Sequence, residues 1–205
     1  MTPLAGVTGV VLAGGRATRM GGIDKARIPL PEAAETLGRR PPTPLSRILD
    51  VFAGRFTACI LVGTRLDHEA PLPVTATADR FEGCGPLGGL HAALSILETP
   101  SAFVCGCDMP SLSGPLIDFM IARSRPDRLL VPVRRGRPEP LHALYPASCL
   151  ESAEKALSDG VRMMLDFFER VPVDYLPEEE FSQVPGADRS FDNINTQADL
   201  ENWRP

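Results

Sequence analysis

The amino-acid sequence predicts one α/β domain, built on a mostly parallel sheet with helices on both faces. Short apolar runs of strand length alternate along the chain with segments of helical periodicity, which is the pattern of such a sheet. The first run, Val7–Leu12, is almost continuously apolar, as a strand buried on both faces would be. The length of 205 residues fits a single domain over residues 1–205 that can bury a sizeable core.

The other elements follow from periodicity and from capping signals. Thr43 followed by Pro44 is a favourable helix start, and Thr196 with Asp199 matches a capping box at the start of a last helix. Apolar residues at helical spacing indicate helices after Thr43, around 90–97, and at 116–121, 147–157 and 161–168. We expect further extended segments at 26–30, 56–62, 73–76, 102–107, 129–133, 139–145 and 171–176.

Composition and charge exclude several classes of protein. The net charge of −5 argues against a general nucleic-acid binder, so an anionic substrate would need a local basic patch. The N-terminus shows neither a basic signal region nor a long apolar stretch, so we expect no membrane partner and a cytoplasmic location. Cys59, Cys105 and Cys107 lie in apolar runs, which indicates reduced core thiols; the Cys105–Cys107 pair lacks partner ligands for a metal.

Residues 12–25, with the sequence LAGGRATRMGGIDK, form a glycine-rich, basic loop directly after the first strand. Glycines let backbone N–H groups approach an anion closely, and Arg19 and Lys25 add the positive charge that phosphate requires. The loop fails the Walker A pattern at Lys25, and it fails the dinucleotide fingerprint at Arg16. We therefore interpret it as a phosphate cradle of another kind, the alternative being a glycine-rich turn with solvated charges.

Three later stretches place polar or glycine-rich sequence next to predicted elements. Residues 79–90 hold four glycines around Pro86 and open a helix, which suits either an anion at the helix N-terminus or close helix-on-strand packing. Asp108 ends the strand at 102–107, where open α/β sheets bind ligands, and its carboxylate suits Mg²⁺; the alternative is an N-cap. Asn193 and Asn195 precede the last helix and either reach into a site or cap that helix.

These stretches occur together in one known family. The blocks at residues 12–25, 85–89 (Gly-Pro-Leu-x-Gly), 107–110 (Cys-Asp-x-Pro) and 193–196 (Asn-x-Asn-Thr) occur in the same order as in the family, and the chain resembles the MobA-like nucleotidyltransferases, or molybdenum cofactor guanylyltransferases. The resemblance implies a Rossmann-like nucleotidyltransferase fold with three αβα layers. It also implies transfer of GMP from GTP to the terminal phosphate of molybdenum-carrying molybdopterin, with release of pyrophosphate.

The resemblance assigns roles by matching position. It implies a catalytic set of Arg19, Lys25 and Asp108, with Mg²⁺ on Asp108, and places Asn193 and Asn195 at the metal and the pterin phosphate. The implied nucleotide-binding residues are Leu12, Ala13, Gly14, Gly15, Lys25, Asp79, Gly85, Pro86, Leu87 and Asp108. The substrates would be GTP and the molybdopterin cofactor, and the resemblance allows transient contact with proteins that insert or accept that cofactor.

The implied reaction agrees with the residue chemistry. A phosphate oxygen is already an anionic nucleophile, so no histidine base is needed, and His68, His91 and His142 receive no catalytic role. The sequence departs from the family at Ala17, where many members have Ser, and in a longer, more basic segment at 31–43. The competing interpretations are a transferase that uses CTP on the same pterin, one that uses a sugar phosphate, and a nucleotide-binding module without activity.

Overall fold

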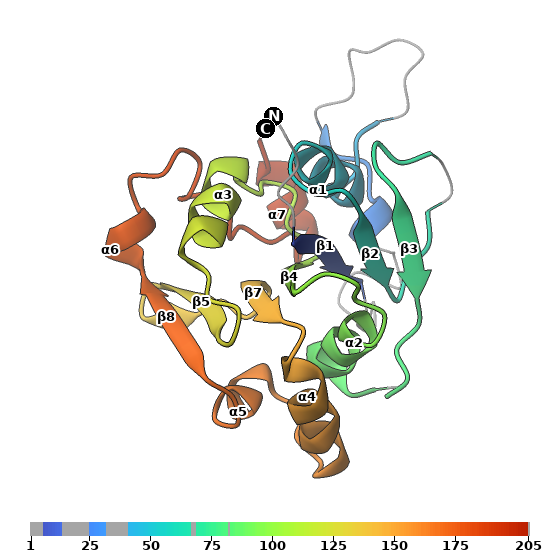
Figure 1. The fold of residues 1–205 in the computed structure, drawn as a ribbon. Helices are drawn as coiled ribbons and strands as arrows, with labels where there is room; N and C mark the ends of the chain where they lie inside the picture. The colour runs from blue at the N-terminus through green and yellow to red at the C-terminus, as the bar shows by residue number, and fades with distance from the viewer. Residues whose placement is uncertain (1–5, 14–24, 32–40, 67–68, 82, 205) are drawn as a thin grey trace.

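The computed structural model describes residues 6–13, 25–31, 41–66, 69–81 and 83–204. Its eight strands form one sheet in the order β3-β2-β1-β4-β7-β5-β6, and β8 pairs with β5 (Figure 1). The strands are β1 (Val7–Leu12), β2 (Cys59–Val62), β3 (Val74–Thr77), β4 (Ser101–Gly106), β5 (Leu129–Arg134), β6 (Arg137–Pro138), β7 (His142–Pro146) and β8 (Val173–Pro177).

The middle of the sheet is built around β1, in which all six residues are buried. It pairs in parallel with β2 on one side and with β4 on the other, where Leu12 lies opposite Gly106. The chain therefore leaves β1 in one direction and later returns on its other side. In open α/β sheets, this reversal of strand order leaves a crevice at the carboxyl ends of the two strands.

The sheet is mostly parallel, as predicted. β7 runs antiparallel to both β4 and β5, while β8 runs parallel to β5. The reversal at β7 follows from the short connection after β5, where Arg135 and Gly136 have positive φ angles of 50° and 73° and turn the chain back through β6. A two-residue turn of this kind joins antiparallel strands, whereas parallel neighbours need a longer crossover.

Helices cover both faces of the sheet, so the protein has three layers (Figure 1). The helical elements are η2 (Lys25–Arg27), α1 (Pro44–Ala53), α2 (Gly85–Leu94), α3 (Gly114–Arg123), α4 (Cys149–Ser158), α5 (Met164–Phe168), α6 (Glu178–Phe181) and α7 (Gln197–Asn202). Buried residues of α1 and α3 pack in the core on one face, and those of α2, α4 and α5 pack in the core on the other. The predicted N-cap at Thr43 and the predicted capping box at Thr196 are both present, and Thr43 also forms a capping box with Ser46.

Close packing of α1 on β1 holds the centre of the molecule. A Cβ atom on Gly9 would lie 2.5 Å from the Phe52 ring and 2.7 Å from the Phe56 ring. Those two rings meet edge to face with their centroids 4.9 Å apart. A glycine in the middle of β1 therefore lets aromatic rings contact the strand backbone directly.

Two predicted extended segments differ from the structure. The segment at 26–30 is not a strand: it begins in η2, and no strand pairs with it among the described residues. Its alternating burial arises because Ile28 and Leu30 pack with Leu200 and Trp203 in a small separate core. The segment predicted at 56–62 pairs only from Cys59 onward, because Phe56 turns inward against α1 instead.

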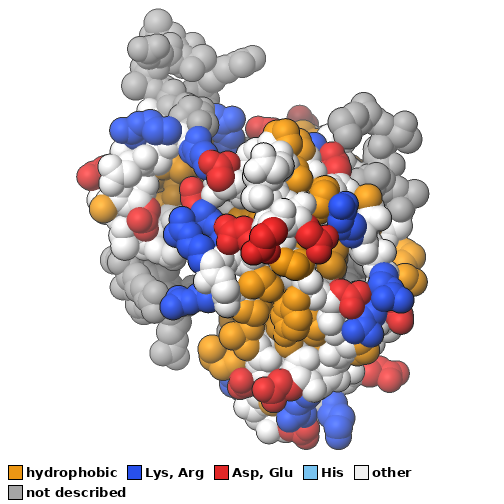
Figure 2. Space-filling model, turned by 90° about the vertical axis from the view of Figure 1, so that its left-hand side faces the viewer, with side chains coloured by type: hydrophobic (Ala, Val, Ile, Leu, Met, Phe, Trp, Pro, Cys, Tyr) orange, Lys and Arg blue, Asp and Glu red, His pale blue; other side chains and the backbone are white. Residues whose placement is uncertain are grey.

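The described surface carries its large exposed apolar side chains at the β8 end of the sheet. Met163, Leu165 and Tyr175 are the exposed large hydrophobic residues there. Figure 2 shows apolar side chains gathered on this face below a band of acidic ones. Among the described residues, no helix combines the length and the apolar character needed to traverse a lipid bilayer. None of the five cysteines forms a disulfide, and burial raises the pKa of the Cys149 thiol to about 12.

Candidate active site

Backbone hydrogen bonds join the carboxyl ends of the central strands β2, β1 and β4. Beyond the end of β1, the Leu12 carbonyl accepts a hydrogen bond from the Cys107 N–H at 3.1 Å, and the Ala13 N–H donates to the Val62 carbonyl at 2.8 Å. The strands are therefore still joined where the glycine-rich loop leaves β1 and where Asp108 leaves β4. This edge gives the residues around it a rigid base.

Three of the predicted site residues meet at this edge. The Lys25 ammonium donates a hydrogen bond to the Asn195 amide oxygen at 2.8 Å. The same nitrogen lies 3.6 Å from a carboxylate oxygen of Asp108. The Lys25 and Asp108 side chains are 20% and 22% exposed, so this contact between charges is shielded from most solvent but open to a ligand.

The Asp108 carboxyl is held in a partly desolvated position. Burial raises its pKa, and the nearby Lys25 charge works in the opposite direction. Asp108 does not cap the next helix, because Ser113 is the N-cap of α3 and its side chain accepts from the Leu116 N–H. Of the two interpretations of Asp108 from the sequence, the structure excludes capping of α3.

Gly106 makes room for this carboxylate. A Cβ atom on Gly106 would lie 2.7 Å from the Asp108 Oδ1 atom. A side chain at Gly106 would therefore force the Asp108 carboxylate to shift from this position. In the sequence, Gly106 is only a glycine between two cysteines. The reason for a residue without a side chain at this position is visible only in the folded turn.

The C-terminal segment closes the site from the other side. The Ile194 N–H donates to the Asp108 carbonyl at 2.8 Å, which ties the segment to the turn after β4. Thr196 caps α7, so the Asn195 side chain is left to contact Lys25 rather than the helix. Asn193 is exposed, and both asparagines line an open hollow of about 650 Å³ together with Trp203.

Asp79 and the second glycine-rich loop meet at the start of α2. One Asp79 carboxylate oxygen accepts from the Phe81 N–H at 2.8 Å, and the other would be 2.6 Å from a Cβ atom on Gly88. Gly88 thus admits the carboxylate against the first turn of α2, while Gly89 allows contact with Leu12. Both interpretations of the loop therefore have support, because its glycines serve packing and also leave the helix N-terminus accessible.

The remaining predicted residues are placed as follows. Leu12 is 6% exposed and Leu87 is fully buried, so the side chains of both belong to the core. Gly85 is exposed and Pro86 is half-buried at the start of α2. Gly14, Gly15 and Arg19, together with most of the 31–43 segment, lie outside the described residues.

The donor set around Asp108 suits Mg²⁺. Within the described ranges, no three His, Cys, Asp or Glu side chains gather closely enough to hold a metal by themselves. Mg²⁺ commonly binds one or two carboxylates and takes its other oxygens from substrate phosphates and water. A single carboxylate that is 22% exposed and lies beside a lysine therefore fits Mg²⁺ shared with a phosphate substrate, whereas a site built from protein ligands alone does not fit.

The fold is that of the open α/β class, and this polar cluster lies at the point where strand order reverses, which is where proteins of this class bind their ligands. Comparison with known proteins makes the class specific. The family model for the MobA-like NTP transferase domain matches residues 9–173. The chain belongs to this family, and it is a nucleotidyltransferase.

Individual relatives are similar over nearly the whole chain. A probable molybdenum cofactor guanylyltransferase from Pelotomaculum thermopropionicum is 31% identical over 193 residues, covering 94% of this chain and 89% of the relative. The solved structure of molybdopterin-guanine dinucleotide biosynthesis protein A from Archaeoglobus fulgidus has a TM-score of 0.72 at 27% identity and covers 95% of both chains. Rv0371c from Mycobacterium tuberculosis, solved with manganese, shares the fold (TM-score 0.55, 20% identity, 84% and 88% coverage).

Proposed function

We propose that this enzyme transfers GMP from GTP to the terminal phosphate of molybdenum-carrying molybdopterin and releases pyrophosphate. Membership of the family and the named guanylyltransferase relatives support the substrates. The observation that carries the proposal is the meeting of Lys25, Asp108 and Asn195 at the edge between β1 and β4. A cation, a carboxylate and an amide at this edge suit a reaction in which phosphate groups on two substrates must be aligned.

The nucleotide would lie across the end of β1 and the start of α2. Backbone groups of Leu12, Ala13, Gly14 and Gly15 would contact it, and Gly85, Pro86 and Leu87 would present the α2 N-terminus. Asp79, held against Gly88, would face the nucleoside. Because the glycines have no side chains, a base and a ribose can approach the backbone closely.

Charge at the reacting phosphates would be balanced by residues from three parts of the chain. Asp108 would hold Mg²⁺, which polarises the α-phosphate when it is bound. Lys25 and Arg19 would offset the charge of the leaving pyrophosphate. Because Asn195 accepts from Lys25, it keeps the ammonium group directed at the Asp108 side of the site.

The acceptor phosphate would approach from the hollow that Asn193 and Asn195 line. Its oxygen is anionic and needs no proton removed, so the chemistry depends on alignment and charge neutralisation rather than on a base. Consistent with this, the Lys25 ammonium contacts Asn195 and Asp108, and no histidine takes part in these contacts. We further propose that the enzyme acts in the cytoplasm and meets insertion or acceptor proteins transiently.

The nucleotide and the reaction are tested together by one assay. The purified protein is incubated with molybdopterin, Mg²⁺ and each of GTP, CTP, ATP and UTP, and released pyrophosphate is measured. We expect turnover with GTP and at least about 10²-fold lower kcat/KM with CTP, because base-edge hydrogen bonds discriminate strongly.

Each competing interpretation predicts a different outcome of this assay. Equal turnover with CTP would remove the guanine assignment. Turnover only when a sugar 1-phosphate replaces molybdopterin would assign a different acceptor. Binding of GTP without pyrophosphate release from any nucleotide would indicate a binding module without activity.

A further inference from the structure

The chain segment that carries both asparagines crosses the edge of the sheet before α7. We call residues 187–196 the C-terminal strap. Its backbone is tied to the turn after β4 at Ile194, and its Asn195 side chain contacts Lys25. The placement of Asn195 therefore depends on whatever fixes the strap.

A buried histidine of the sheet contacts the strap. His142 begins β7 and pairs with Cys105 near the end of β4. Its side chain is fully buried, and its Nε2 atom lies 2.7 Å from the Ser190 hydroxyl oxygen. The same oxygen accepts the Ser113 N–H at 2.8 Å. One hydroxyl thus joins β7, the strap and the loop that leads from Asp108 to α3.

The surroundings of His142 are apolar. Its ring lies edge-on to Phe103, with centroids 5.1 Å apart, and tilted against Phe191 at 4.4 Å. Burial lowers the pKa of His142 to about 4, so the ring is neutral at neutral pH. Its Nδ1 atom is buried without a hydrogen-bond partner among the described residues. Burying a polar nitrogen without a hydrogen bond destabilises the fold, and an apolar ring in the same space would avoid that cost. What His142 adds to the structure must therefore come from the hydrogen bond at Nε2.

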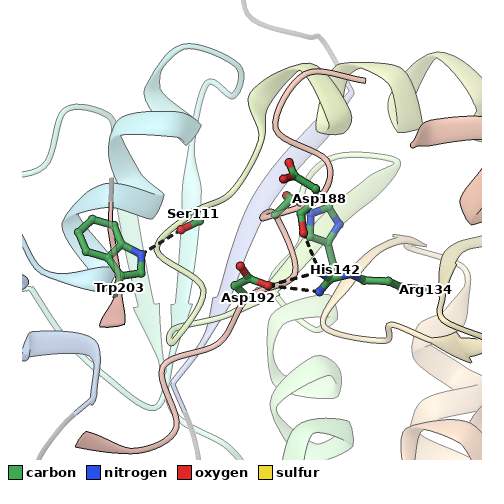
Figure 3. Close-up of polar contacts among 7 residues, drawn as sticks. Ser111, Arg134, His142, Asp188, Asp192 and Trp203 are labelled. Carbon is green, nitrogen blue, oxygen red and sulfur yellow. Dashed lines mark hydrogen bonds and ion pairs between the residues drawn. The ribbon is translucent and has the colours of Figure 1, made fainter. Parts of the chain in front are cut away.

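Two further contacts hold the strap and α7 from outside (Figure 3). The Arg134 guanidinium donates to the Asp188 carbonyl at 2.6 Å and to the Asp192 carboxylate at 3.3 Å, and so spans the strap on either side of Ser190. Beyond α7, the Trp203 Nε1–H donates to the Ser111 hydroxyl at 2.9 Å. His142 is the buried contact in this set, and the outer ones are partly solvated.

We propose that His142 and Ser190 are positioning residues for guanylyl transfer. Their hydrogen bond fixes the position of the strap relative to the sheet, and thereby holds the Asn195 side chain on Lys25 beside Asp108. Neither residue touches the substrates, and both act through the strap and the Ser113 loop. This role rests on the proposed function, since it concerns the same site. It predicts that loss of the bond weakens catalysis more than it weakens GTP binding, because most of the proposed nucleotide contacts lie at the end of β1 and the start of α2.

The variants are His142→Phe, which keeps an aromatic ring, and Ser190→Ala, which removes one oxygen. Thr8→Val is the matched control, because it removes a buried hydroxyl bond (Thr8 to Thr99, 2.8 Å) at the amino end of β1. We expect both test variants to lower kcat by about 10-fold to 10²-fold with little change in the KM for GTP, and Thr8→Val to leave both unchanged. His142→Gln, whose amide can still form a hydrogen bond with the Ser190 hydroxyl, should recover part of the loss.

A second measurement needs no activity. Trp203 is the single tryptophan of the chain and is 8% exposed. In His142→Phe and Ser190→Ala we expect red-shifted emission, easier acrylamide quenching and at least about tenfold faster hydrogen exchange at the Ile194 amide, with native circular dichroism. Thr8→Val should match the wild type.

The outcomes separate this inference from the proposed function. Unchanged kcat and unchanged exchange at Ile194 would overturn the positioning role, as would a parallel loss in Thr8→Val. If the wild type shows no guanylyl transfer, the proposed function fails, and the fluorescence and exchange data still decide whether His142 holds the strap. If His142→Phe does not fold, Ser190→Ala provides the decision.

Discussion

Asp108→Asn is expected to lower kcat for guanylyl transfer by at least about 10³-fold while the protein stays folded. The amide has the same size, but it carries no negative charge for Mg²⁺ or for the Lys25 ammonium 3.6 Å away. Burial already disfavours the ionised carboxyl, so the loss of the ion pair is partly offset by relief from desolvation. We therefore expect the free energy of unfolding to change by only about 1 kcal/mol. Steady-state pyrophosphate release and urea unfolding measure the two quantities.

Asp118→Asn is the matched control for this change. Asp118 on α3 also pairs with a cation, since its carboxylate lies 3.1 Å from the Arg55 guanidinium, and its side chain is 30% exposed. That pair lies outside the Lys25–Asp108 contact, so we expect the control to keep wild-type kcat. Activity near wild type in Asp108→Asn would show that Asp108 does not serve the reaction.

Lys25→Met is expected to lower kcat by about 10²-fold to 10³-fold and to raise the KM for GTP. Methionine keeps an unbranched chain of similar length, but it removes the charge that would offset the triphosphate. It also removes the hydrogen bond that Lys25 donates to Asn195. The chain contains only two lysines, and the other, Lys155, is exposed on α4. Lys155→Met therefore controls for the loss of a lysine side chain elsewhere in the protein, and we expect its kcat and its KM for GTP to match those of the wild type.

The pattern across both substrates makes this test sharper. Loss of Lys25 should affect the nucleotide most, because its ammonium group faces the phosphates. If Lys25→Met changed only the KM for molybdopterin, the lysine would belong to the acceptor half of the site. A variant with unchanged kcat and unchanged KM for both substrates would remove Lys25 from the mechanism.

The sequence was sufficient for the order of elements and for much of the site. The run Val7–Leu12 is the buried central strand, and helices begin after the predicted N-cap at Thr43 and the predicted capping box at Thr196. These features depend on local chemistry, which periodicity and side-chain type record directly. The resemblance of the four motif blocks also grouped Lys25, Asp108 and Asn195, and the structure brings these three side chains into contact.

Features that depend on distant packing could not be predicted. The apolar alternation at 26–30 resembled a strand, but those side chains pack on α7 residues from the far end of the sequence. Gly106 and Gly88 are needed because a carboxylate occupies the place of a Cβ atom, which no spacing rule reveals. His142 was set aside for lack of a chemical role, and its contact with Ser190 exists only in the folded chain.

The most direct measurement is a crystal structure of the protein with a non-hydrolysable GTP analogue and Mn²⁺, located by its anomalous scattering. The proposed mechanism predicts a metal ion bonded to the Asp108 carboxylate and to the analogue's phosphates, with the Lys25 ammonium on the same phosphates and guanine between the end of β1 and the start of α2. A nucleotide bound elsewhere, or a metal ion that does not contact Asp108, would contradict it.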